Sequence, residues 1–453
     1  MLYAAFAYLI IFTYSAYRIL NKDIFAPSVI TGITLVLGTF VAILGNYKWN
    51  VTVPFVVLLI YVLGTISLLM GEITTKSRCI SSNKFTFTQR YSVNEVIIPK
   101  WIVIIALLFS LFVVVWSKKK ATEIAYANGY YGADWQSMPV YVKWAVSNGK
   151  ARFGFTLSLC RQVLEVITYL GVYFFIMNAS VTGIKYAFRN HYYLLCFIVP
   201  FAFMLSIQGQ RSSFIGLISF AFYILWNQNK KLRVKLNNKR VIMFGGIFVL
   251  LFLVYFIVVG NLTGRAATDN AMEDVYIYVG SSIVDFAEYF NSSLGKFTFT
   301  WGTRTFSGIY STMKTLIPFL PSVKRATGSF DFGFVVFENG SRSNVYGPYA
   351  KFYSEFGYLG VICLSFLQGC IYRLLYNNAR NKSATPWSIY LFAYISYGIV
   401  IAFVDEQQFQ LLFSTYQIIH LVLTYFLLNY CINNYGKLPV KAIREKEFFL
   451  RKW

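Results

Sequence analysis

Apolar runs of about 20 residues recur along almost the whole chain, and this repetition restricts the fold more than any other feature. At 1.5 Å per residue, an α-helix of that length crosses roughly 30 Å of hydrocarbon. Backbone N–H and C=O groups inside a bilayer must pair within the protein, which favours helices for such runs. The pattern predicts an all-α integral membrane protein with about 11 transmembrane helices, in the range of about 10 to 12. The expected spans are residues 2–21, 24–47, 49–72, 97–116, 155–178, 191–208, 211–227, 241–261, 350–373, 386–404 and 409–430.

The composition supports a single polytopic membrane domain over residues 1–453. Hydrophobic residues make up 57% of the chain and charged residues only 13%, against about 25% in soluble domains. The first residues, "MLYAAFAYLI", have no basic segment before the apolar core and no small-residue cleavage site, so we expect a retained helix.

The basic residues set the expected orientation. The chain has 41 Lys and Arg against 18 Asp and Glu, a net charge of +23. Placing the N-terminus outside and the C-terminus in the cytoplasm puts the cluster "KKLRVKLNNKR" and the basic tail 431–453 on the cytoplasmic side, as the positive-inside bias requires. Contact with anionic lipids explains these clusters, and no soluble domain exists to carry a nucleic-acid site.

Two long connectors then face the exterior, residues 117–154 and 262–349. The second holds aromatic residues throughout, which is not typical of disorder. Its stretch 271–291 has apolar residues at helical spacing and predicts one or two interfacial helices.

Histidine and cysteine restrict the chemistry of an exterior site. The only histidines are His191, expected in the cytoplasm, and His420, about 12 residues or roughly 18 Å into the last span. No exterior loop has a pair of cysteines, so neither a disulfide framework nor a cysteine metal site is expected. The sequence predicts an exterior site that works without histidine, metal or cofactor.

Arg211 lies in the short connector Gly209-Gln210-Arg211-Ser212, which also opens a helix. Free backbone N–H groups at a helix start, with the guanidinium beside them, suit a phosphate or pyrophosphate. The alternative is a helix cap at Ser212 with an arginine that reaches the interface. Arg161 lies about six residues inside span 155–178, and Glu165 follows one turn later as an ion-pair partner or as part of a polar site.

Two acidic residues stand at exterior helix ends. Glu355, in the segment "YGPYAKFYSEFGYLG", is a candidate general base, although Lys351 one turn earlier could pair with it. Asp405, in "VDEQQF", is a candidate catalytic carboxylate or a cap of the last span.

The "GQRS" element and the later "YSEFGYLG" element, separated by one long exterior loop, resemble the Wzy-type polymerases of O-antigen and related bacterial surface polysaccharides. These proteins typically show G-x-R-[ST/A] and Y-x-[DE]-F-G-x-x-G elements, each opening a helix. The resemblance covers the topology of nearly the whole chain.

The resemblance implies a GT-C-like integral-membrane glycosyltransferase at the exterior, periplasmic face of the bacterial inner membrane. Such an enzyme transfers a growing glycan from undecaprenyl pyrophosphate to the next lipid-linked repeat unit, without metal or nucleotide sugar. Its donor and acceptor are both lipid-linked oligosaccharides, and a chain-length regulator protein is a possible partner.

The residue roles that follow are pyrophosphate binding and sugar contact. Arg211 matches the helix-start arginine of the family, and Arg161, Arg265 and Arg304 join it by location. Trp301, Tyr349 and Tyr353 are candidate sugar contacts, with an interfacial aromatic belt as the alternative.

Two other functions stay open. O-antigen ligases of the same superfamily rely on an exterior histidine, which this sequence is expected to lack there. A flippase or exporter of the same lipid-linked oligosaccharide would need related halves, and no such repeat is found in the sequence.

Overall fold

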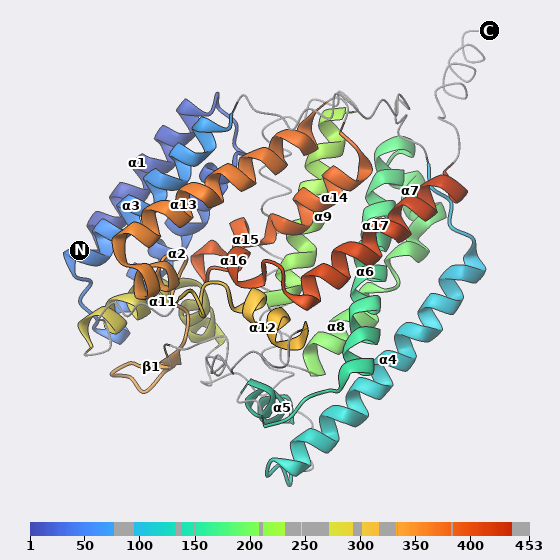
Figure 1. Ribbon diagram of the computed structural model, residues 1–453, viewed down its shortest axis with the longest axis horizontal. Helices are drawn as coiled ribbons and strands as arrows, with labels where there is room; N and C mark the ends of the chain where they lie inside the picture. Colours follow the sequence, from blue (N-terminus) through green and yellow to red (C-terminus); the bar gives the residue numbers. More distant parts are fainter. Residues whose placement is uncertain are drawn as a thin grey trace.

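The computed structural model describes residues 1–76, 95–132, 138–147, 150–207, 212–231, 246, 271–292, 301–316, 332, 334–381 and 384–436. Helices dominate these residues (Figure 1). In chain order they are α1 Leu2–Ile19, α2 Pro27–Trp49, α3 Phe55–Thr74, α4 Lys100–Ala127, α5 Met138–Ser147, α6 Phe155–Thr182, α7 Ile184–His191, η1 Tyr192–Leu195, α8 Ile198–Ile207, α9 Ser212–Lys231, α11 Ala271–Asn291, α12 Ser307–Leu316, α13 Ala350–Arg380, α14 Pro386–Ile395, α15 Tyr397–Val400, η2 Ile401–Phe403, α16 Gln408–Leu411 and α17 Thr415–Tyr435.

The prediction of a multi-pass helical membrane protein is confirmed. Within the described residues, eight helices are long and apolar enough to cross a membrane, namely α1, α2, α3, α4, α6, α13, the segment Pro386–Phe403 and α17. A ninth crossing arises if Ile184–Leu195 and Ile198–Ile207, bent by 43° at their junction, count as one broken span. In place of the predicted span 211–227, α9 has an apolar part, Ser213–Asn227, that is too short to be counted as a crossing. The predicted span 241–261 lies outside the described residues except for residue 246, so eleven crossings stay a prediction.

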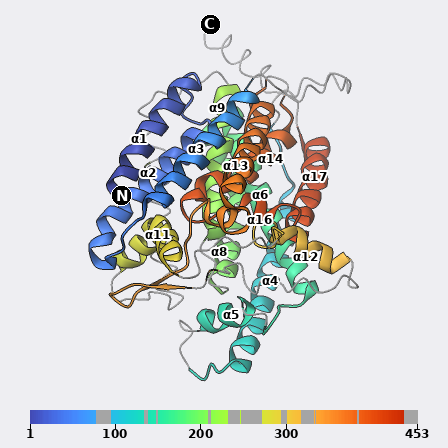
Figure 2. The same ribbon diagram turned by 60° about the vertical axis from the view of Figure 1, so that its left-hand side comes forward.

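Two groups of helices build the apolar core. One core joins α6, α8, α9 and α14, and the other joins α1, α2, α3, α11 and the first part of α13. Figure 2 shows α1, α2 and α3 along one flank and α17 on the other, with α13 and α14 between them. Helix α13 therefore belongs to both halves of the bundle.

Helices α3 and α13 approach closely at two glycines. A Cβ on Gly71 would lie 2.0 Å from the carbonyl oxygen of Phe366, and one on Gly369 would lie 2.1 Å from that of Leu68. Only glycine leaves room for backbone contact of this kind, which is a common way for membrane helices to pack without a hydrophobic driving force between them.

The two ends of the bundle differ. We call one end of the bundle the loop end; it carries residues 138–147, 150–154, 301–316, 334–349 and 404–414. The other end, the network end, carries residues 20–26, 75–76 and 384–385. The predicted orientation assigns the loop end to the exterior.

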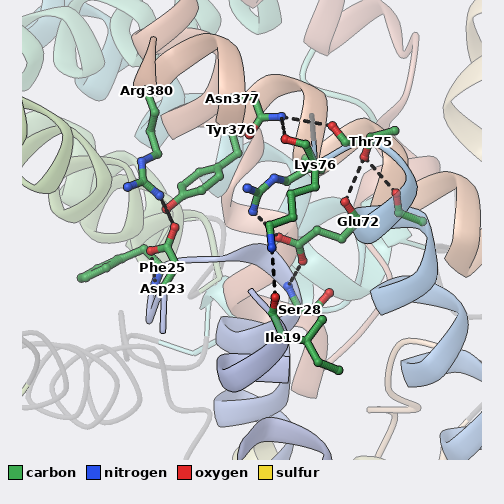
Figure 3. A network of polar contacts seen from close by, with 12 residues as sticks. Ile19, Asp23, Phe25, Ser28, Glu72, Thr75, Lys76, Tyr376, Asn377 and Arg380 are labelled. Atoms are coloured by element: carbon green, nitrogen blue, oxygen red, sulfur yellow. Dashed lines mark hydrogen bonds and ion pairs between the residues drawn. The ribbon is translucent and has the colours of Figure 1, made fainter. Parts of the chain in front are cut away.

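Ion pairs and hydrogen bonds join three helices at the network end (Figure 3). The Glu72 carboxylate of α3 accepts the Ser28 N–H at the start of α2 at 2.8 Å and a hydrogen bond from Arg373 of α13 at 2.9 Å. Asp23, before α2, pairs with Arg380 of α13. Each carboxylate thus satisfies a helix end or a cation from another helix, which offsets the cost of burying it.

The exterior connectors contain more helix than the sequence indicated. Helix α4 continues to Ala127, so the segment 117–121, expected just outside the span, is helical. Helix α5 contacts α4 and α8 at the loop end. In the second connector, α11 is one continuous helix that packs on α2, and the strands β1 Val335–Val336 and β2 Arg342–Ser343 form an antiparallel pair.

Candidate functional site

The element "YSEFG" breaks helix α13 near its start. Residues 350–356 are helical, but Gly357 has φ of 63° and ψ of −154°, a conformation essentially restricted to glycine. The helix resumes at Tyr358 and runs on to Arg380. The segment 350–356 is therefore a separate short helix at the loop end.

Glu355 holds a turn of the long connector. One carboxylate oxygen accepts the N–H of Arg304 at 2.8 Å, the other accepts the N–H of Thr305 at 2.7 Å, and Thr303 Oγ1 lies 3.4 Å from the first. The residue is 0% exposed. This arrangement fixes residues 301–306 against α13 just before α12 begins. The predicted ion pair with Lys351 is absent, because Lys351 binds a different carboxylate.

Lys351 pairs with Asp405. The Lys351 Nζ donates to Asp405 Oδ2 at 2.7 Å and to Gln410 Oε1 at 2.8 Å, and both charged side chains are buried. Burial raises the pKa of Asp405, and the Lys351 charge opposes that shift. The backbone supports the contact, since the Gly347 N–H donates to the Val404 carbonyl at 2.9 Å.

Glu406 and Ser414, which the sequence analysis did not single out, cap the two helices that follow. Glu406 accepts the N–H of Phe409 at 2.9 Å and that of Gln410 at 3.2 Å at the start of α16. Burial raises the pKa of Glu406 to about 7. Ser414 accepts the Gln417 N–H at 3.1 Å and caps α17, so the expected cap at Asp405 was wrong.

The other candidates at this end differ in exposure. Trp301, with φ of 58°, is 75% exposed, and its carbonyl accepts the Tyr310 hydroxyl at 2.6 Å. The Arg304 guanidinium lies 5.1 Å from the Phe332 ring centre. Tyr349 and Tyr353 are only 2% and 8% exposed, which leaves them little surface for a sugar. Trp301 alone of the three aromatic candidates presents its ring to solvent.

A second polar group lies near the loop-end termini of α6 and α17. The Arg161 guanidinium lies 4.5 Å from the Phe153 ring centre. Glu165, one turn further along α6, has His420 Nδ1 at 3.8 Å from its Oε1. Within the described residues no ion pair joins Arg161 to Glu165, in contrast to one of the two interpretations of the sequence.

His420 is closer to the loop end than its sequence position indicated. Helix α17 begins at Thr415 rather than 409, which places His420 in the second turn. The sequence contained a signal for this helix start, because Ser414 followed three residues later by Gln417 is a capping box. The predicted depth of His420, about 12 residues into the last span, was therefore wrong, and its side chain is 0% exposed.

Helix α9 begins beside this second group. A Cβ on Gly216 would lie 3.0 Å from the Tyr169 hydroxyl and 3.4 Å from the Tyr397 ring. Helices α6 and α9 both run from the loop end to the network end (Figure 1). Ser212 is one turn before Gly216 and Glu165 one turn before Tyr169, so the start of α9 lies at about the level of Glu165.

Two predicted arginines lie outside the described residues, namely Arg211 and Arg265. Ser212 is the first residue of α9. Helix α15 lies between the group around Glu165 and the group around Asp405. Its Tyr397 faces Gly216 of α9, and a Cβ on Gly398 would lie 3.6 Å from the Cβ of Gln408.

A buried acid in α11 was not anticipated. Asp285 Oδ2 accepts hydrogen bonds from the Val345 N–H at 2.9 Å, from Ser281 at 3.2 Å and from Ser343. Burial raises the pKa of Asp285 to about 8, against the lowering effect of these donors. The residue attaches the β-hairpin to α11. The available signal was the carboxylate of Asp285 directly between the apolar residues Val284 and Phe286.

Comparison with known proteins adds no assignment. No protein-family model, curated protein or solved structure matches this chain. Within the described part of the chain, no three His, Cys, Asp or Glu side chains are grouped as a metal site requires. Any functional argument therefore rests on the geometry of two groups at the loop end. One contains Lys351, Glu355 and Asp405, and the other contains Glu165 and His420.

Proposed function

We propose that this chain is a membrane-embedded glycosyltransferase that polymerises undecaprenyl-pyrophosphate-linked oligosaccharide repeat units into a surface polysaccharide. One observation carries the proposal: helix α9 starts at the end of the bundle at which Glu355 lies. Helix α9 starts at Ser212, the last residue of the first element, and Glu355 of the second element binds the turn that contains Arg304.

The reaction suits the residue types at this end. The leaving group is a pyrophosphate, so arginines and helix-start N–H groups can stabilise the charge that develops on it. Arg161 and the start of α9 supply these groups in the described residues, and the proposal assigns Arg211 and Arg265 the same role. Arg304 is fixed in place through its backbone N–H.

The two carboxylates proposed as catalytic serve a different purpose in this geometry. Glu355 accepts two backbone N–H groups, and Asp405 binds Lys351. We therefore assign both to holding the connector 301–306 and the loop 404–410 beside the site, as positioning residues. The acceptor sugar could stack on the exposed ring of Trp301.

His420 favours one second candidate, an O-antigen ligase. The resemblance implies that ligases use a histidine at the exterior end, and His420 lies in the second turn of α17. A polymerase and a ligase would act on the same class of lipid-linked glycan, so they differ in the acceptor.

Deletion of the gene, followed by separation of surface glycans by length, tests the proposal. A polymerase deletion leaves single repeat units attached to the lipid carrier or core. A ligase deletion leaves long chains unattached, and a flippase deletion leaves single units on the cytoplasmic side. Full-length attached chains after a clean deletion would refute all three functions.

A further inference from the structure

Arg161 and Glu165 carry charge in the apolar bundle without the contacts that usually accompany buried charge. Arg161 makes no hydrogen bond or ion pair with the described part of the chain, and its Nε is buried. Glu165 is 7% exposed and makes no hydrogen bond with the described residues, since His420 Nδ1, at 3.8 Å from its Oε1, is too far away for one.

His420 is oriented by a chain of hydroxyl groups. Its Nε2 lies 3.0 Å from the Tyr390 hydroxyl, which the Thr424 hydroxyl approaches to 3.5 Å. If Thr424 donates to Tyr390 and Tyr390 donates to Nε2, the remaining ring proton is on Nδ1 and points toward Glu165. The Tyr394 ring stacks on the imidazole at 4.2 Å and fixes its plane. Among the residues that the structure describes, the imidazole Nδ1 has no hydrogen-bond partner.

Burying ionisable groups without hydrogen-bond partners costs free energy, unless a ligand supplies those partners. An ionisable side chain in a membrane helix costs about 2.5 to 3.5 kcal/mol on insertion scales, and buried polar atoms are nearly always paired. Here an arginine, a glutamate and a histidine near one another all have unfilled hydrogen-bonding capacity, and they lie at the level where α9 begins. By contrast, both carboxylate oxygens of Glu72 at the network end have partners, the Arg373 guanidinium and the Ser28 N–H.

We propose that Glu165 is the catalytic base of the glycosyl transfer, with His420 as its positioning residue and Arg161 facing the pyrophosphate. This inference rests on the proposed function. The acceptor sugar's O–H bond breaks and its proton passes to the Glu165 carboxylate. The acceptor oxygen forms a bond to the donor's anomeric carbon, and the bond from that carbon to the pyrophosphate breaks, with the electron pair leaving on the pyrophosphate oxygen.

Several titratable or charged groups face Glu165 from the elements around it. They are Arg161 and Tyr169 on α6, Tyr390 and Tyr394 on α14, and His420 on α17. Arg161 is the charged member of this set. A carboxylate in these surroundings can accept a proton from a hydroxyl and return it to solvent through the loop end.

The test measures polymer formation in membranes of the deletion strain that carry each variant, with the strain's own lipid-linked repeat unit as substrate. Glu165→Gln keeps the side-chain shape and removes the base, so the rate should fall about 100-fold to 10,000-fold. The wild-type rate should rise with pH as the carboxylate loses its proton, and the residual rate of Glu165→Gln should lack this rise. His420→Asn, which keeps a donor near the Nδ1 position, should retain more activity than His420→Leu.

Glu123→Gln is the matched control, because Glu123 is an exposed glutamate of α4 that pairs with Lys120 at 2.9 Å. Its rate should equal that of the wild type. The amount of each variant in the membrane and its elution in detergent show whether it is folded. A folded Glu165→Gln protein with the wild-type rate and pH profile overturns the assignment of the base, whereas a wild-type protein that does not restore polymer to the deletion strain refutes the proposed function itself.

Discussion

The Nζ atom of Lys351 lies 2.7 Å from Oδ2 of Asp405, and this contact joins the first turn of α13 to the loop that precedes α16. Both side chains are buried. A buried pair of this kind is costly to break from one side, because the remaining charge has no partner. It determines where the loop 404–410 lies relative to Glu355.

Lys351→Met should destabilise the protein by about 3 to 5 kcal/mol, since Asp405 is left buried without its cation. The double variant Lys351→Met, Asp405→Leu should lose less than the two single variants together, because it leaves no buried charge. Thermal unfolding of the detergent-solubilised protein measures each value. Additive losses would mean that the two side chains do not interact.

Glu355→Gln should loosen the turn 301–306. A glutamine amide has one acceptor oxygen, so one of the N–H groups of Arg304 and Thr305 loses its partner, at a cost of about 1 to 3 kcal/mol. Hydrogen exchange at these two amides should become faster, and polymer formation should fall only in part. Complete loss of activity with unchanged exchange would instead identify Glu355 as the base.

Asp285 should make the protein less stable at high pH. Its pKa in the folded chain is raised from 3.8 to about 8, so folding favours the protonated acid. The resulting stabilisation is complete below pH 3.8 and is lost as the pH rises through about 8. Unfolding temperatures of wild-type protein and Asp285→Asn should converge at low pH and separate as the pH rises, with the variant the less sensitive. Parallel curves would contradict the assignment.

Arg211→Ala should abolish chain growth, and Arg211→Lys should restore it only in part. The reason is that an ammonium group lacks the two-pronged donor geometry of a guanidinium toward phosphate oxygens. Surface glycan length in the complemented deletion strain measures both. Arg152→Ala, at an exposed arginine of the loop end, is the control and should give wild-type length. Full-length chains with Arg211→Ala would leave that arginine the role of an interfacial cap.

The sequence predicted the helical membrane fold because its signal is local. A run such as 350–373 is long and apolar enough to be recognised as a membrane span from its own residues, and α13 covers it. The break at Gly357 could not be predicted in the same way, since a glycine in an apolar helix is equally compatible with close packing.

Pairing between distant residues was the least predictable part of the site. Lys351 and Glu355 are one turn apart and of opposite charge, which favours a local pair, yet each binds a partner some 50 residues away in sequence. Burial decides this outcome, because in the interior a carboxylate gains more from two fixed N–H groups than from one mobile cation. Likewise, the depth of His420 depended on a helix start that hydropathy alone placed six residues too early.

The break at Gly357 divides α13 into two segments that make different contacts. Beyond it, α13 is held to α3 by backbone contact at Gly71 and Gly369, where even a methyl group does not fit. Before it, residues 350–356 contact α11 through Tyr353 and the loops through Lys351 and Glu355. Sequence changes that adapt the proposed catalytic end to a different sugar can therefore accumulate before Gly357, while the contact between α13 and α3 beyond it stays constant.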